Sequence, residues 1–242
     1  MTIDVSNVHV FTQNNIRIET QNAQDKKVVY FDVYGMETEP HDADILFITH
    51  DHYDHYSPEN ARKVMKEDTI AIVPQPLIEK SKQIEQDPGS VPQNPNEPAF
   101  ESISVLGASQ VVGVSAGDSF ELEGIAIEVV PAYNVRPERQ GCHPKKDKGV
   151  GYVVTIEGIR YYIAGDTDQN PENSTVTCDV MLVPVGGTFT CDPKEAAEFV
   201  NDVHPKVAIP THYGSIAGQK SNGDEFAQCV DEGISVIKKL PY

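Results

Sequence analysis

Thr49-His50-Asp51-His52-Tyr53-Asp54-His55 is the stretch of this chain that says most about its fold and its chemistry. It has the pattern His-x-His-x-Asp-His, and it follows an apolar run at residues 44–48 that predicts a buried strand. Imidazole nitrogen and carboxylate oxygen are donors that suit zinc, iron and manganese. Without a cation, so many ligand-type groups would repel or desolvate one another. The pattern therefore predicts a metal site at a strand end rather than a polar surface loop.

Four other predicted strands also end in polar or glycine-rich turns. The turns are Pro-Ala-Tyr-Asn at 131–134, Gly-Asp-Thr-Asp at 165–168, Gly-Gly-Thr at 186–188 and Thr-His-Tyr-Gly at 211–214. Glycine allows close backbone approach, and short loops on a rigid scaffold hold ligand side chains in place. A site built along one edge of packed sheets requires such strand ends. Asp166 and His212 lie in two of these turns and are candidate ligands beside the 50–55 cluster.

The rest of the chain predicts a mixture of strands and helices. Strands are expected at 7–11, 16–19, 28–33, 69–73, 150–156 and 159–164, and helices from Pro58, at 76–84, at 193–203 and at 224–231. Residues 86–98 hold four prolines and predict an irregular loop, either a mobile flap or a solvated excursion. Because the candidate ligands lie on both sides of this loop, we expect one domain over residues 1–242.

The composition argues against several classes of partner and location. The net charge of -18 argues against a nucleic-acid partner, since a polyphosphate backbone would be repelled. No apolar run approaches the roughly 20 residues of a membrane span, and the first ten residues do not resemble a secretory signal. The four cysteines have no CxxC spacing, which indicates free thiols in a reducing cytosol. We expect a cytoplasmic protein with a small-molecule substrate, and the sequence predicts no particular oligomeric state.

Taken together, these motifs resemble those of metallo-β-lactamase-fold hydrolases, in the branch similar to ascorbate-6-phosphate lactonases. The motifs that carry the resemblance are the 49–55 run, 131–134, His-Pro-Lys at 143–145, Ala-Gly-Asp-Thr at 164–167, Pro-Val-Gly-Gly-Thr-Phe-Thr at 184–190 and Pro-Thr-His-Tyr-Gly at 210–214. The resemblance implies an α+β fold, a four-layer αββα sandwich with two divalent metal ions between the sheet edges. Zinc is the expected metal by donor type, and manganese or iron fits the same donors.

The resemblance also implies which residues bind each metal. His50 and His52 would bind the first ion, Asp54, His55 and His212 would bind the second, and Asp166 would bridge them. Two such ions lower the pKa of a shared water from 15.7 toward about 7. The expected enzyme is a metal-dependent hydrolase that uses a metal-bound hydroxide on a small ester, lactone or phosphodiester.

One position departs from the pattern of the fold. Many members place a histidine after the middle strand as the third ligand of the first metal, and this chain has Asn134 there. An amide oxygen is a weaker donor for zinc than imidazole. The departure leaves three alternatives open. Asn134 is a weak ligand of the first metal, His143 is the ligand in its place, or the first metal site is only partly occupied. We favour His143 in the pocket, as a ligand or as a proton donor to the leaving group.

Further roles follow from position in the pattern. We predict Asp54, His143 and Tyr213 as catalytic residues, with Tyr213 hydrogen-bonding a developing oxyanion as Tyr133 could also do. Asp32 is expected to orient a ligating histidine. Arg136, Lys145 and Lys146 are candidates to receive a phosphate or carboxylate. Two alternatives stay open: a non-catalytic metal-binding module, favoured by Asn134, and a nuclease-type phosphodiesterase, which the acidic charge disfavours.

Overall fold

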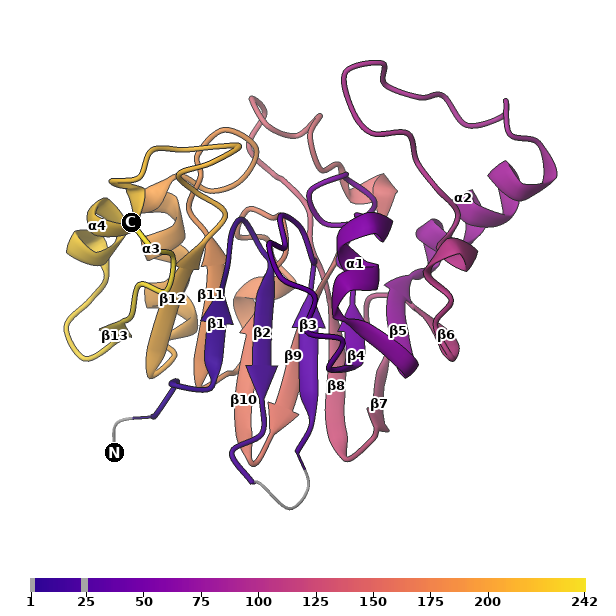
Figure 1. The fold of residues 1–242 in the computed structure, drawn as a ribbon. Helices are drawn as coiled ribbons and strands as arrows, with labels where there is room; N and C mark the ends of the chain where they lie inside the picture. The colour runs from indigo at the N-terminus through magenta and orange to yellow at the C-terminus, as the bar shows by residue number, and fades with distance from the viewer. Residues whose placement is uncertain (1–2, 23–25) are drawn as a thin grey trace.

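The computed structural model describes residues 3–22 and 26–242, and its strands form two sheets (Figure 1). The first sheet contains, in spatial order, β1 (Val8–Val10), β2 (Ile16–Glu19), β3 (Val28–Phe31), β4 (Ala43–Phe47), β5 (Met65–Pro74) and β6 (Gln110–Val114). The second contains β13 (Ser235–Val236), β12 (Val207–Thr211), β11 (Val180–Pro184), β10 (Ile159–Ile163), β9 (Val150–Ile156), β8 (Ile125–Pro131) and β7 (Ser119–Leu122). Each sheet is part parallel and part antiparallel, so strands from distant segments end at a common edge.

The main core lies between the two sheets. Phe31 of β3 and Phe47 of β4 stack with ring centroids 4.6 Å apart, and Phe47 meets Tyr152 of β9 across the sandwich at 5.0 Å. All three side chains are fully buried. Because every residue of β3, β11 and β12 is buried, both faces of these strands must be covered, one by the opposite sheet and one by helices.

Helices cover the outer face of each sheet. On the first sheet, α1 (Pro58–Val64) and α2 (Gln75–Gln86) pack Val64 and Leu77 into a second apolar cluster with β-strand side chains such as Tyr30. On the second sheet lie α3 (Pro193–Val203) and α4 (Asn222–Cys229), with Phe199 against Tyr162 of β10 at 6.3 Å. This order of layers confirms the predicted α+β fold, a four-layer αββα sandwich.

Most predicted elements are present, and the differences have local causes. The capping box of α3 forms as its sequence predicts, with Asp192 and Glu195 each bonding the other's backbone N–H. The strands β6 and β7 were not predicted, because each is the edge of its sheet and its exposed residues interrupt the apolar pattern. β5 begins four residues earlier than expected, with an irregular register against β4.

The proline-rich loop follows α2 and leads to a short 3₁₀ helix, Ile103–Leu106. Residues 87–102 contain no helix or strand, in agreement with the loop predicted at 86–98. Two further single-turn 3₁₀ helices occur at Lys145–Asp147 and Asn173–Thr175. The expectation of one domain over 1–242 stays a prediction, and residues 1–2 and 23–25 of that span lie outside the described residues.

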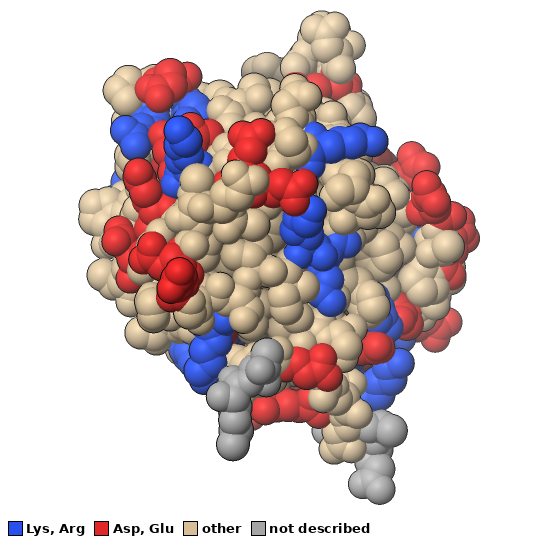
Figure 2. Space-filling view, turned by 90° about the vertical axis from the view of Figure 1, so that its left-hand side faces the viewer, with Lys and Arg blue, Asp and Glu red and all other residues tan. Residues whose placement is uncertain are grey.

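The surface agrees with the acidic composition. Figure 2 shows the face at the left of Figure 1, where Lys and Arg form a short run and small groups beside patches of Asp and Glu. A nucleic-acid backbone is normally tracked by a wider basic surface than this face offers. Within the described residues, none of the helices is long and apolar enough to cross a membrane.

Candidate metal centre

The predicted ligands meet at one edge of the sandwich, in the turns that follow strands of both sheets. The 50–55 run follows β4, Asp166 follows β10 and His212 follows β12. Gly165, directly before Asp166, has a φ of +68°, and a Cβ there would lie 2.9 Å from the carbonyl oxygen of Val150. Only glycine fits this turn without strain, so the turn holds Asp166 against the opposite sheet.

Three of the ligands form a fully buried group, which we call the inner group: Asp54, His55 and His212. One donor atom from each residue lies within 4.8 Å of the other two. The Nε2 atoms of His55 and His212 lie 3.7 and 3.4 Å from Oδ2 of Asp54. The two imidazole rings are stacked, 5.3 Å apart, so both present the same nitrogen to one carboxylate.

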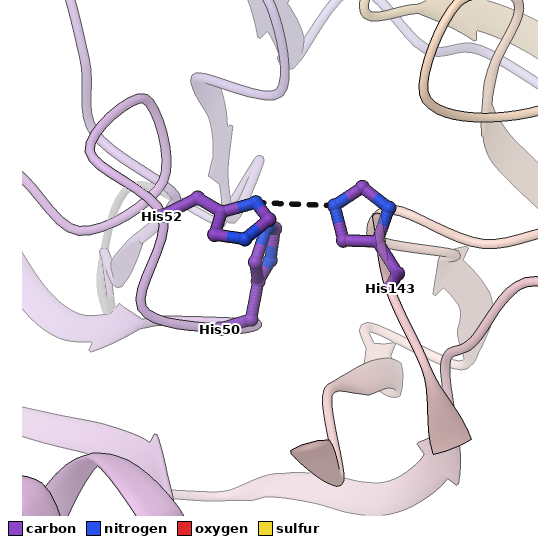
Figure 3. A group of neighbouring side chains, drawn as sticks. All are labelled: His50, His52 and His143. Carbon is purple, nitrogen blue, oxygen red and sulfur yellow. Dashed lines mark hydrogen bonds between the residues drawn. The ribbon is translucent and has the colours of Figure 1, made fainter. Parts of the chain in front are cut away.

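A second group, the outer group, consists of His50, His52 and His143 (Figure 3). Its donor atoms also lie within 4.8 Å of one another, and His143 Nε2 is 3.2 Å from His52 Nδ1. His50 and His143 are buried, while His52 is exposed. The outer group is therefore the side of the centre that faces solvent.

Asp166 joins the two groups. Its Oδ2 lies 3.4 Å from Nε2 of His55, 3.4 Å from Nε2 of His143 and 3.2 Å from Nε2 of His212. Two donors each about 2.1 Å from a tetrahedral ion lie about 3.4 Å apart, so these separations match the donor spacing of a coordination shell. In addition, the buried Nε2 atoms of His50 and His55 have no hydrogen-bond partner among the described residues. The residues present therefore fit divalent metal ions.

The second nitrogen of three buried imidazoles is held by an acceptor. Nδ1 of His55 lies 2.8 Å from Oδ2 of Asp32, and Nδ1 of His143 lies 3.2 Å from the carbonyl oxygen of Phe189. Nδ1 of His50 lies 3.0 Å from Oγ1 of Thr49, whose hydroxyl donates in turn to Asp32. A proton on each Nδ1 leaves the Nε2 lone pair free to face the centre, which is the tautomer that a metal ligand needs.

Carboxylates and imidazoles shift one another's pKa values in the inner group. Burial disfavours a charged His55, but Asp166, Asp32 and Asp54 outweigh it and raise the pKa of His55 well above its usual value. Burial likewise opposes protonation of His212, and Asp166 overrides it, so the pKa of His212 rises to about 9. The imidazoles in turn hold the pKa of Asp54 at about 2 against the effect of burial, and that of Asp166 well below its usual value.

In the outer group, the pKa values of the buried imidazoles are lowered instead of raised. Burial and the neighbouring imidazoles lower the pKa of His50 well below its usual value. Burial, only partly offset by Asp166, lowers the pKa of His143 to about 4. These two imidazoles are therefore neutral at physiological pH, which is the form that binds a metal.

One member of the inner group and two residues that touch it have backbones in a strained conformation. Gln13, Asp32 and His212 have φ values of 47°, 47° and 56°, in the left-handed region that residues other than glycine rarely adopt. Asp32 also accepts hydrogen bonds from the Thr49 backbone N–H and hydroxyl, at 2.8 and 2.7 Å. Such strain persists only where the surroundings over-determine it, and it is concentrated at functional sites.

Two residues near the centre were not predicted from the sequence: Gln13 and Asn14, in the turn between β1 and β2. The Gln13 side-chain amide lies 3.4 Å from both Asp54 Oδ2 and His212 Nε2, and its backbone carbonyl accepts the His212 N–H at 3.1 Å. The Asn14 amide lies 3.5 Å from Asp166 Oδ1. In the sequence they resemble ordinary turn residues, and only their burial, at 0% and 1% exposed, distinguishes them.

The Asn134 side chain lies on the Nδ1 side of the His143 ring, whereas His52 lies on the Nε2 side. Its Nδ2 donates to the carbonyl oxygens of Arg139 and Phe189, at 3.0 and 2.7 Å, and lies 3.3 Å from Nδ1 of His143. His143 Nε2, on the other side of the ring, faces His52. Asn134 thus contacts the edge of the imidazole that is turned away from the outer group.

Tyr213, predicted as catalytic, lies away from this centre. Its buried hydroxyl has no hydrogen-bond partner among the described residues, and it packs against Gly223 of α4, where an added Cβ would lie only 2.4 Å from it. Its ring contacts Tyr242 edge-on at 5.8 Å. His212 sits in a left-handed turn, which sends the next side chain into the core beneath α4. Tyr213 is therefore not among the side chains that the structure gathers at this centre, and its catalytic role stays a prediction.

Three of the other predicted pocket residues, Tyr133, Arg136 and Lys145, have partners of their own, whereas Lys146 forms no ion pair within the described residues. The Tyr133 hydroxyl donates to Glu172 at 2.5 Å, and Lys145 forms an ion pair with the same carboxylate. Arg136 pairs with Glu195 at 2.9 Å. These contacts anchor the 134–148 loop, and they leave Arg136 and Lys145 neutralised rather than free for an anionic substrate.

Residues 7–212 match the family described as beta-lactamase superfamily domain. The chain is 35% identical to a UPF0173 metal-dependent hydrolase of Methanopyrus kandleri over 136 residues, which are 54% of this chain and 59% of that relative. It is 28% identical to another of that name from Thermococcus onnurineus, over 83% of this chain and 80% of the relative. The first alignment thus spans less than two thirds of the relative, and the second spans most of it.

A solved structure with the same fold is that of a candidate metal-dependent hydrolase from Parabacteroides distasonis. The two structures superpose with a TM-score of 0.71 at 28% sequence identity, covering 96% of this chain and 92% of the other. The likeness therefore extends over nearly the whole of both chains.

Proposed function

The chain belongs to the beta-lactamase superfamily, among the metal-dependent hydrolases named UPF0173, and we propose that it hydrolyses a small ester, lactone or phosphodiester at a two-metal centre. The observation that carries this proposal is the position of Asp166, whose one oxygen lies 3.2–3.4 Å from imidazoles of both groups. Bound divalent ions there would supply Lewis acidity and make water nucleophilic near neutral pH.

Each group would hold one ion. His50, His52 and His143 supply three nitrogens to the outer position, and Asp54, His55 and His212 supply two nitrogens and a carboxylate to the inner one. Asp166 would contribute a carboxylate oxygen to both positions. Zinc is the metal that this set of donors suits best, and manganese or iron is compatible with the carboxylates.

In this proposal His143 takes the third position of the outer group, and Asn134 is its support. The Asn134 amide and the His143 Nδ1 share the Phe189 carbonyl oxygen, which holds the ring with Nε2 toward the centre. Positioning of this kind raises ligand basicity and limits the motion of a ligand that comes from a loop. His143 is then a ligand, and the leaving-group proton must go to another group or to solvent.

The experiment is to purify the protein, load it with zinc or manganese and test it on a panel of carboxylic esters, lactones and bis(4-nitrophenyl) phosphate. We expect turnover of at least one class, abolished by a chelator and restored by the metal. The His52→Ala variant should stay folded and lose activity. Full turnover by metal-free protein, or by His52→Ala, would contradict the proposal. The likeness to ascorbate-6-phosphate lactonases stays a prediction that the lactone part of the panel tests.

The alternative of a non-catalytic metal-binding module was favoured by Asn134 alone. With His143 beside His50 and His52, the outer group keeps three nitrogen donors, so Asn134 no longer argues for a decayed site. Two metals per chain without turnover on the whole panel would restore the module. A nuclease is disfavoured by the net charge of -18.

A further inference from the structure

We propose that the cavity over the metal centre accepts substrates whose non-reacting part is apolar and free of negative charge, and that Glu97 enforces this selection. The inference rests on the proposed function, because it assumes that the reacting group is bound at the metal centre. It narrows the substrate to carboxylic esters or lactones without a phosphate or carboxylate handle.

A cavity of about 470 Å³ opens directly above the ligands. Its floor is made by ligands of both groups, and its walls are lined by residues of five loops: Tyr53, Asn96, Glu97, Gly141, Cys142, Phe189 and Ile216. A cavity of this size suits a small molecule rather than a polymer, and it places any bound substrate against Asp166 and His212.

Large apolar side chains are exposed at this cavity. Phe189 is 38% and Ile216 is 36% exposed, although most residues of their size are buried elsewhere in the described chain. Ile216 also borders a neighbouring hollow with Phe11, which is 40% exposed. Exposed apolar groups gathered around one opening favour a ligand that covers them. The wall therefore offers a surface for an acyl chain or ring.

The same wall offers nothing to an anion. Of the described residues that line the cavity, none is lysine or arginine. In the loop that carries Gly141 and Cys142, Arg136, Arg139 and Lys145 are in ion pairs with Glu195, Asp168 and Glu172, and Lys146 of the same loop does not line the cavity. Recognition of a phosphate or carboxylate normally uses an unpaired basic group. An anionic tail bound in this cavity would have no basic side chain to pair with.

Apart from Asp54 and the shared Asp166, Glu97 is the one carboxylate that lines the cavity, among the residues that the structure describes. It comes from the proline-rich loop, where the Asn94 side-chain amide donates to its Oε1 at 2.5 Å and the Asn94 carbonyl accepts its backbone N–H at 3.1 Å. Within residues 3–22 and 26–242, it forms no ion pair with a lysine or arginine. Its charge is therefore uncompensated and would repel a negative tail.

The test uses two hydroxamates of equal chain length, pentanohydroxamate and the monohydroxamate of glutarate, which differ in a terminal carboxylate. Each binds metal through the hydroxamate, so affinity for the zinc-loaded protein, measured by calorimetry, does not depend on turnover. We expect the neutral probe to bind at least about tenfold tighter.

Glu97→Lys should reduce the ratio of the two affinities about tenfold or more, and Glu97→Gln should reduce it in part. Glu67→Lys, which changes the net charge equally at an exposed position, is the matched control.

Equal affinity for the two probes, no binding of either, or a ratio that Glu97→Lys leaves unchanged would overturn the inference. The matching 4-nitrophenyl esters, pentanoate and hydrogen glutarate, measure turnover in parallel. If neither ester is hydrolysed while the hydroxamates still discriminate, the carboxylic-ester function fails and the charge selection stands. If phosphorylated lactones prove to be the preferred substrates, the charge selection fails and the hydrolase function stands.

Discussion

The inner and outer groups use similar side chains but are held in different ways. All three inner residues are buried, whereas His52 of the outer group is exposed. The inner group contains its own carboxylate, Asp54, and is surrounded by Asp32 and Gln13 on strained backbone. The outer group has only imidazoles, and His143 comes from a loop. The difference indicates a rigid, charge-balanced inner position and a more accessible outer one.

This comparison makes the inner position the tighter metal site. Ligands that are already oriented lose little conformational freedom on binding, and the anions Asp54 and Asp166 add electrostatic attraction. The outer position depends on neutral imidazoles and on the link to Asp166. His52 and His143 line the cavity beside Asp54 and His212 of the inner group, so both positions border the space that a substrate would occupy.

The largest effect is expected at the residue that the two groups share. Asp166→Ala should reduce kcat/KM by about 10³-fold or more, because both metal positions lose a ligand. Metal content by mass spectrometry should fall from two ions per chain to one or none, with the far-UV circular dichroism unchanged. Asp68→Ala, an exposed carboxylate, is the control. Two tightly held ions in Asp166→Ala would mean that the groups are independent.

The electrostatic contrast predicts an unusual pH dependence for the chelated protein. The pKa of His212 is raised to about 9 in the folded state from an ordinary 6.5, so its stabilising effect is complete below pH 6.5 and is lost as the pH rises through 9. The corresponding loss is on the order of 3 kcal/mol. Urea unfolding at pH 6.5, 8 and 9.5 measures it, and His212→Gln should flatten the trend. Rising stability over this range would contradict the assigned charges.

Asp32→Asn should weaken metal binding more at the inner position than at the outer one. The carboxylate orients His55 through Nδ1, so its loss should weaken metal binding by about 10–100-fold at the inner position. The outer position, whose imidazoles contact Asp32 only through Thr49, should change less. Competition with a chelator measures both affinities, and Asp68→Asn is the control. Equal weakening of both sites would show that the centre behaves as one unit.

Asn134→Ala is expected to have the smallest effect and to act on the outer position alone. Removing the two hydrogen bonds to Arg139 and Phe189 loosens the His143 loop, at about 1 kcal/mol per bond, or roughly fivefold each in affinity. Asn201→Ala, which removes a half-buried amide with two hydrogen bonds far from the centre in sequence, is the control. Complete loss of the outer metal would identify Asn134 as a ligand instead of a support.

The fold was predictable because the motifs are local and lie at strand ends. His50, His52, Asp54 and His55 are close in sequence, so one apolar strand before them was enough to locate the centre. The layers could be expected from the resemblance, whereas the edge strands β6 and β7 could not be seen, since exposed strands lack an apolar pattern.

The remaining features depend on contacts between distant segments. Gln13 meets His212 across about 200 positions of sequence, and nothing in a Thr-Gln-Asn turn indicates that contact. The burial of Tyr213 against Gly223 of α4 likewise depends on a contact between separate segments that the sequence does not indicate. The role of Glu97 required knowing which loops enclose the cavity.

The central claim is that side chains from both sheets converge on a pair of cations. Crystals grown with zinc, measured on both sides of the zinc absorption edge, test it most directly. We expect two anomalous peaks with donors about 2.0–2.3 Å away, one bound by His50, His52 and His143, the other by Asp54, His55 and His212, with Asp166 touching both. Peaks at other places, or imidazoles that remain beyond bonding distance at full zinc occupancy, would contradict it.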